Sequence, residues 1–249
     1  MLRTSAILFL AALLGACAMV PVGPTRNEKA SKINVTLGTT YYRQGNLELA
    51  NEKLLKALRQ DPQSSQAHHA YAVLQYRFRN KDKAMEHFDK AIELDPQNSE
   101  ALNNYAVILC NEGRYANSVD MFMRAVDNPA YATPEVAYTS GAVCLLKEDA
   151  SKTEQAKDYL QKALAVRINY RLALINMAEI LFDEKNYEMT KLYLQRFNNA
   201  GAQTARSLWL EIRNELALGN EARAYGLAAK LKADFPESSQ YQSWLELSK

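Results

Sequence analysis

The sequence predicts an all-α fold, a right-handed superhelical solenoid of about six helical hairpins closed by a C-terminal capping helix. Two observations predict it. Small residues recur with a period close to 34 residues in three separate registers, and helix breakers are scarce, with only nine glycines and seven prolines in 249 residues. A fixed period of about 20–50 residues is typical of a repeat array, in which each unit packs only on its neighbours. Few breakers suit helices that are joined by short turns.

The three registers place small side chains on both helices of every hairpin. The first contains Gly38, Ala72, Ala106, Gly141 and Ala178, the second Ala50, Ala84, Ser118, Ala156, Thr190 and Ala224, and the third Ala57, Ala91, Ala125, Ala163, Phe197 and Leu231. Small residues let two antiparallel helices approach closely, and large ones such as Leu54, Phe88 and Phe122 are expected to fill the space between hairpins. The 34-residue period is that of the tetratricopeptide helix–turn–helix unit.

This period divides residues 31–249 into six units and a cap. The predicted units are 31–64, 65–98, 99–131, 132–168, 169–202 and 203–236, and the cap is 237–249. Proline closes several units, because it has no N–H to continue a helix. Unit four carries three extra residues in its polar turn, and unit six has Ile212 where a small residue is expected.

The first thirty residues have a different character. Residues 1–16 read as a signal peptide, since a basic start precedes an uncharged apolar run that is too short to span a bilayer. The run ends in Leu14-Gly15-Ala16-Cys17, which resembles a bacterial lipobox, so we predict that the chain is cleaved before Cys17 and that Cys17 is acylated. The alternative is an ordinary signal sequence or a transmembrane anchor, in which Cys17 has no special role. Residues 17–30 hold two prolines and show no apolar periodicity, and we interpret them as a flexible tether.

Nothing in the composition or the motifs points to catalysis. The formal net charge is +2, which gives no basic excess for binding nucleic acid. The chain contains no metal-ligand, phosphate-loop or nucleophile motif, and the adjacent His68 and His69 point about 100° apart on a helix. We therefore expect no enzyme activity, no cofactor, no metal and no small-molecule substrate.

The inner face of the first helices is the predicted protein-binding groove. Its candidate residues are Val35, Thr39, Tyr42, His69, Val73, Tyr76, Asn103 and Val107. They form an apolar and aromatic surface, which suits an extended or helical apolar segment of a partner. The equivalent positions in unit four are Tyr138, Ala142 and Leu145, which we also expect on the inner face. In units five and six, Glu179, Asp183 and Arg213 interrupt this apolar surface. The alternative interpretation is that some of these residues pack one hairpin on the next.

Cys110 and Cys144 lie one repeat apart on the first helices of units three and four. An exported protein meets an oxidising compartment, which favours a disulfide. Cysteine is also commonly buried as a free thiol. Both interpretations stand at this point, and a bridge requires the two Cα atoms to lie within about 7 Å.

Several segments resemble a known family. Ala101-Leu102-Asn103-Asn104-Tyr105, the Gly113-Arg114-Tyr115 turn, and Gln203 to Trp209 are similar to the type IV pilus biogenesis and stability lipoproteins of the PilF/PilW family. The resemblance runs from the lipobox to the capping helix. It implies an outer-membrane lipoprotein of a Gram-negative bacterium, with its repeat domain in the periplasm, that binds the pilus secretin subunit and helps it to localise and multimerise.

Two other functions fit an exported repeat array. One is a lipoprotein that recruits or regulates peptidoglycan enzymes, and the other is a periplasmic chaperone for exported polypeptides. Both would use the same groove. Some members of the resembling family stabilise extended pili instead of assembling the secretin, and the sequence leaves that choice open.

Overall fold

A computed structural model describes residues 25–248 of the chain. Within this range the chain forms thirteen α-helices and one short 3₁₀ helix, and no strand. In chain order the elements are α1 (Arg26–Arg43), α2 (Leu47–Gln60), α3 (Ser65–Arg77), α4 (Lys81–Leu94), α5 (Ser99–Asn111), α6 (Tyr115–Val126), α7 (Pro134–Glu148), η1 (Ala150–Lys152), α8 (Thr153–Val166), α9 (Arg171–Asp183), α10 (Tyr187–Asn199), α11 (Ala205–Ala217), α12 (Glu221–Asp234) and α13 (Ser239–Leu247).

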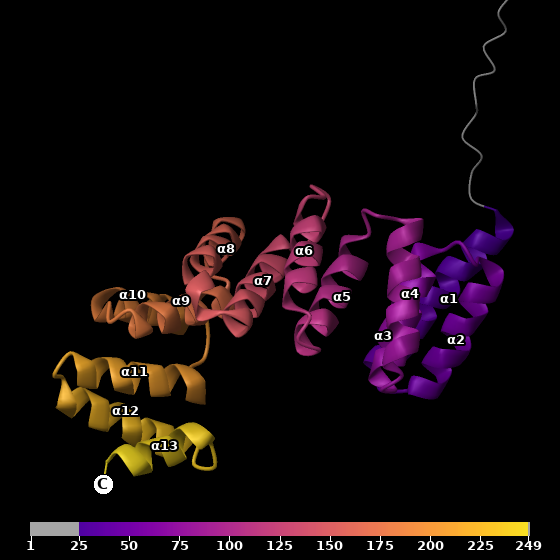
Figure 1. The fold of residues 1–249 in the computed structure, drawn as a ribbon. Helices are drawn as coiled ribbons and strands as arrows, with labels where there is room; N and C mark the ends of the chain where they lie inside the picture. The colour runs from indigo at the N-terminus through magenta and orange to yellow at the C-terminus, as the bar shows by residue number, and fades with distance from the viewer. Residues whose placement is uncertain (1–24, 249) are drawn as a thin grey trace, which may run out of the picture.

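The helices pair into six hairpins that stack in chain order, which confirms the predicted all-α solenoid. Figure 1 shows the array curving from the indigo first hairpin to the yellow α13. The turn inside each of the first hairpins lies at the edge opposite to the start of α1. The three predicted small registers lie at the helix contacts, where Ala50, Ala84 and Ala156, among others, are fully buried.

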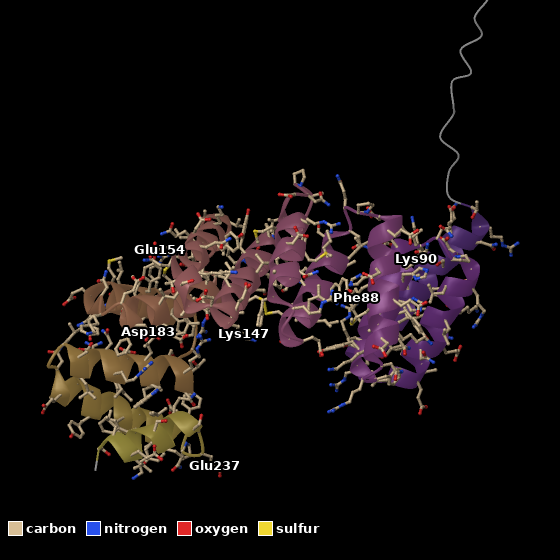
Figure 2. All side chains as sticks on the ribbon, viewed as in Figure 1. Phe88, Lys90, Lys147, Glu154, Asp183 and Glu237 are labelled. Atoms are coloured by element: carbon tan, nitrogen blue, oxygen red, sulfur yellow. A yellow bond between two sulfur atoms is a disulfide. The ribbon has the colours of Figure 1, made fainter. Side chains whose placement is uncertain are left out.

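Close helix packing depends on the small residues. A methyl group added at Gly38 would lie 2.6 Å from Cγ of Leu54 on α2, so glycine is needed there for α1 and α2 to approach. Between hairpins the large residues fill the space. The ring of Phe88 stacks on that of Tyr105 with centroids 5.2 Å apart, and Figure 2 shows Phe88 between α4 and α5.

The two ends of the array differ. At the C-terminal end, α13 covers α11 and α12 and buries Trp244, as expected of a cap. At the N-terminal end, Ile33 and Leu37 on α1 are 62% and 40% exposed. Their counterparts one repeat later, Ala67 and Tyr71, are buried. No residue in the range 25–248 covers this face of α1.

The predicted tether, residues 17–30, is too long. Helix α1 begins at Arg26, because Thr25 and Glu28 form a capping box. The Thr25 side chain accepts from the Glu28 amide, and the Glu28 carboxylate accepts from the Thr25 amide. This first turn is mostly solvent-exposed, so it carries no apolar periodicity to reveal it. The lipobox, Cys17 and the signal peptide lie outside the described residues.

The predicted inner-face positions of unit four are wrong by one residue. Ala142 and Leu145 are buried in the core between units four and five, and Val143 lies on the inner surface instead. The small register is spaced by 35 residues here, from Ala106 to Gly141, whereas the groove face is spaced by 36, from Val107 to Val143. The extra length of this unit forms η1 in the turn before α8. Along residues 25–248 no helix is both long and apolar enough to cross a membrane.

Candidate protein-binding groove

The first helices of units one to three line a cavity of about 460 Å³. Helices α1, α3 and the start of α5 contribute to its walls. Five of the eight predicted groove residues line it, namely Val35, Thr39, Tyr42, His69 and Val73. The stacking of equivalent helices therefore brings together side chains that are about 34 residues apart in the sequence.

The other three predicted residues lie elsewhere. Val107, which is 38% exposed, lines a second cavity further along the array. Tyr76 lines a small cavity at the turn between α3 and α4. Asn103 is half-buried, lines none of these cavities, and has a buried Oδ1 that accepts no hydrogen bond within residues 25–248.

The aromatic and aliphatic groove residues are half-buried, not fully exposed. Val35 and Tyr42 pack against the core between the first two hairpins, and Val73 and Tyr76 against the core of the next two. Each such side chain presents one face to the core and the other to the groove. Both interpretations from the sequence therefore hold in part, since these residues support the stacking and also form the surface.

Helix α5 closes the cavity with polar groups. The Nδ2 of Asn104 donates to Nε2 of His69 at 2.8 Å, which ties α5 to α3. Burial lowers the pKa of His69 to about 4, so its imidazole is neutral at neutral pH. Arg43 and Glu100 supply the charged groups of the lining. The cavity thus combines apolar and aromatic side chains with several polar ones, among them one cation and one carboxylate.

The groove continues beyond unit three. A second cavity, of about 330 Å³, is lined by residues of α5, α6, α7, α9 and α11. The expectation that charges interrupt units four to six holds only in part. Glu179 is held by Arg206 in an ion pair, and the Arg213 guanidinium stacks over the Phe182 ring at 4.6 Å. Leu172, which is 53% exposed, lines this cavity together with Val107.

A disulfide forms part of the floor of the second cavity. Cys110 on α5 is bonded to Cys144 on α7, with 5.9 Å between the two Cα atoms, inside the limit for a bridge. Cys110 lines the cavity, and Cys144 is fully buried. The bond links unit three to unit four, so it ties the two halves of the array together.

The histidines do not assemble a metal site. Nδ1 of His68 lies 2.9 Å from Nδ1 of His87, while His69 points to Asn104. His68 Nε2 lies 3.1 Å from the carbonyl of Pro62, so it carries the hydrogen and its Nδ1 accepts from His87. Nowhere in residues 25–248 do three or more His, Cys, Asp or Glu side chains gather in a way that could hold a metal ion.

Sequence reasoning missed several residues of the first cavity. They are Thr36, Arg43, Gln66, Ala70, Asn98, Glu100 and Asn104. The prediction took one residue from each turn of the first helices, but the face that a helix turns towards a groove is wider than one residue per turn. Neighbouring positions on the same face would have found Thr36, Arg43 and Gln66. Asn104 can be recognised only from its contact with His69, which no spacing in the sequence reveals.

Comparisons with known proteins agree with this architecture. Family models of the tetratricopeptide repeat match residues 35–99 and 87–119. The type IV pilus assembly protein PilF of Pseudomonas aeruginosa is 31% identical over 246 residues, which cover 96% of this chain and 97% of PilF. A solved structure of P. aeruginosa PilF is similar with a TM-score of 0.82 at 30% identity, covering 90% of this chain and all 100% of that one. The crystal structure of PilW, described as a widely conserved type IV pilus biogenesis factor, gives a TM-score of 0.77 at 28% identity, covering 86% and 98%.

Proposed function

Since this chain belongs to the family of tetratricopeptide-repeat proteins of type IV pilus biogenesis that includes PilF and PilW, we propose that it is a non-enzymatic scaffold that binds the pilus secretin subunit. Binding through the first-helix groove would localise the secretin and promote its multimerisation. The proposal includes a lipid anchor at Cys17 in the outer membrane, with the repeat domain in the periplasm.

One observation carries the groove as the binding surface. The cavity of about 460 Å³ is walled by half-buried apolar and aromatic side chains from two successive hairpins, and it holds one neutral histidine. Concave sites that combine apolar side chains with polar groups able to orient a ligand are typical of segment binding. Aromatic anchors in such sites each contribute about 2 kcal/mol or more to binding. The exposed Ile33 and Leu37 on α1 add apolar surface near this end of the array.

The test is a set of groove variants measured for both binding and folding. Tyr42→Ala removes an aromatic wall, and Val73→Glu places a charge among apolar groups. Both are expected to weaken binding of the purified periplasmic part of the secretin subunit by about tenfold or more. Ile168→Glu is the control, because Ile168 is 69% exposed in the turn between α8 and α9, outside both groove cavities.

Thermal unfolding separates the two roles of these residues. If Tyr42→Ala loses binding only in proportion to a loss of folded protein, the tyrosine acts through the core. If both groove variants fold normally and bind as the parent does, the groove is not the binding surface. In cells, deletion of the gene is expected to leave secretin as monomer instead of heat-stable multimer, as seen on an immunoblot.

The anchor is tested separately. Cys17→Ala is expected to release the protein from the outer-membrane fraction, because attachment would then lack its acyl chains. An unchanged distribution in envelope fractions would contradict lipidation at this position. Groove binding measured with the purified repeat region does not depend on this result.

A further inference from the structure

The turns inside the hairpins share a backbone conformation that favours glycine. Each turn of units one, three and six has a glycine at positive φ, with values of 79° at Gly45, 78° at Gly113 and 79° at Gly219. At the same position unit two has Arg79, with φ of 64°, and unit five has Lys185, with φ of 60°. A residue with a side chain is strained in this conformation, at a cost of about 1 kcal/mol. Two units therefore keep a cation where glycine would be more stable.

The two cations have opposite surroundings. Residues 77–83 contain four basic side chains and one acidic one, whereas residues 183–188 contain three acidic side chains and one basic one. Lys185 thus lies among carboxylates, which compensate its charge. Arg79 lies among other cations, so local electrostatics add to the backbone strain. Nothing in the fold of unit two requires an arginine there.

The basic turn of unit two also forms a concave surface. A cavity of about 320 Å³ is lined by Tyr76, Arg77, Arg79, Lys81 and Glu112. Lys81 is paired with Glu112 at 2.6 Å. Among residues 25–248, neither Arg77 nor Arg79 has an ion pair or a side-chain hydrogen bond, so their guanidinium groups have no protein acceptor. Phe78, between them in the sequence, is 38% exposed.

We propose that this basic turn, residues 76–81, docks an acidic segment of a protein partner that also carries apolar side chains. Carboxylates of the segment would bind Arg77 and Arg79, which are unpaired and present planar donors suited to carboxylate. An apolar side chain would contact Phe78. Arginine and aromatic residues together are typical of the residues that dominate protein interfaces. The site lies outside the first-helix groove and extends the proposed function to a second contact.

Its position favours a protein over a lipid surface. The turn lies at the edge of the array opposite to the start of α1 (Figure 1). Helix α1 has 18 residues, so the two edges are about 27 Å apart along it. A lipid anchor at Cys17 would hold the membrane near the start of α1. The basic turn would then point away from the bilayer.

The test uses a fluorescein-labelled peptide of Asp, Glu and Leu and a matched peptide of Asn, Gln and Leu, with the whole chain after removal of the signal peptide. Fluorescence anisotropy is expected to show binding of the acidic peptide only, weakening as salt is raised. Arg79→Gly is expected to weaken it about two- to fivefold, and Arg77→Ala with Arg79→Gly about tenfold. Arg79→Gly relieves backbone strain, so its melting temperature should not fall, and lost affinity cannot come from unfolding.

Lys185→Gly is the matched control. It removes the same charge and relieves the same strain in an acidic turn, so peptide binding should be unchanged. The proposal would be overturned if Arg79→Gly bound the acidic peptide as tightly as the parent does. It would also be overturned if Arg79→Gly and Lys185→Gly lost the same affinity. Arg79-dependent binding of phosphatidylglycerol vesicles with no binding of the acidic peptide would overturn it as well. Tyr42→Ala alters the groove on α1 without adding a charge beside Arg77, so it should leave peptide binding intact. Failure of the basic-turn proposal is therefore distinguishable from failure of the groove proposal.

Discussion

Units one to three and units four to six use one fold with different buried chemistry. In α1–α6 the buried polar side chains are uncharged, and they are Ser31, Asn34, Gln75, Ser99 and Ser118. In α7–α12 the buried set includes three carboxylates, Glu135, Glu211 and Glu215. The backbone spacing is nearly the same in both halves. The repeat therefore fixes where helices pack but not which interactions hold them.

In the first half, neutral hydrogen bonds recur with the repeat. Ser31 Oγ donates to the carbonyl of Ala57 at 3.0 Å, and Ser65 Oγ to that of Ala91 at 2.7 Å, one unit later. Neutral bonds of this kind respond little to pH or salt. The half that forms the larger groove cavity is thus held by packing and neutral hydrogen bonds.

In the second half, a network of charges joins three helices. Arg223 on α12 lies 3.0 Å from Glu215 and 3.4 Å from Glu211, both on α11. Lys191 on α10 lies 3.4 Å from Glu215. Buried charges of this kind need all their partners, because a carboxylate left without its cation keeps its desolvation penalty. This half should be the more sensitive to single substitutions.

The largest expected effect comes from Arg223→Met combined with Lys191→Met. Together they leave Glu215, whose side chain is 1% exposed, without either of its two cations. The free energy of unfolding of the last units should fall by about 3–5 kcal/mol. Both tryptophans, Trp209 and Trp244, lie in α11 and α13, so their fluorescence during urea unfolding reports on this half alone.

A third substitution shows whether charge is the cause. Adding Glu215→Gln to Arg223→Met and Lys191→Met removes the unpaired carboxylate and should recover part of the stability. Circular dichroism, which reports on all helices, should show a smaller change than fluorescence does. An equal loss with and without Glu215→Gln would mean that the two cationic side chains act by packing alone.

Reduction of the Cys110–Cys144 bond is expected to have the next largest effect. The bond closes a loop of 34 residues, which corresponds to about 3–4 kcal/mol of stabilisation through the unfolded chain. Because it links the two halves, its reduction should separate the fluorescence transition from the circular dichroism transition. The Cys110→Ala, Cys144→Ala double variant should show the same separation and no further response to reductant. Coincident transitions in the reduced protein would show that packing alone couples the halves.

The fold could be predicted from sequence because small residues at a fixed period report directly on close helix contacts. The start of α1 was missed, although Thr25 and Glu28 carry the capping-box spacing, because an exposed turn has no apolar pattern. In units one to three, five of the eight predicted groove residues line the first cavity. The prediction failed in unit four, where the packing register and the groove face are offset by one residue.

The buried charges could not be predicted in the same way. Glu211 and Glu215 stand four residues apart on one helix, the spacing of a solvated face. Their partners come from α10 and α12, and only the stacked structure brings them together. The first cavity was predicted in part because its residues follow the repeat, whereas the contact from Asn104 to His69 does not.

Acid should weaken the first half through His69. Its folded pKa is about 4 against an ordinary value of 6.5, so the unfolded chain binds the proton more readily between these values. The stabilisation from a neutral His69 is complete above pH 6.5 and is lost as pH falls towards 4, by about 3 kcal/mol. His69→Gln keeps a group that can hydrogen-bond Asn104 but does not titrate.

The measurement is the free energy of unfolding of both proteins from pH 7.5 to 4. Carboxylates titrate in parent and variant alike, so the difference between the two curves isolates His69. Chemical shifts of its ring protons would give the folded pKa directly. A constant difference across this range would show that His69 is not the titrating group.

The smallest effect, and the one that compares the halves most directly, is glycine to alanine at one repeat position. Gly38 and Gly141 occupy the same place in units one and four. A Cβ at position 38 would lie 2.6 Å from Leu54 Cγ, and Leu54 is buried, so Gly38→Ala should cost about 1–2 kcal/mol. A Cβ at position 141 would meet Met123 and Tyr159 at 3.4 and 3.5 Å, which are close to ordinary contacts. Alanine is the better helix former by about 0.5–1 kcal/mol, so Gly141→Ala should be neutral or stabilising. Urea unfolding followed by circular dichroism measures both, and the same sign for the two variants would show that the helix contacts of the two halves are equally tight.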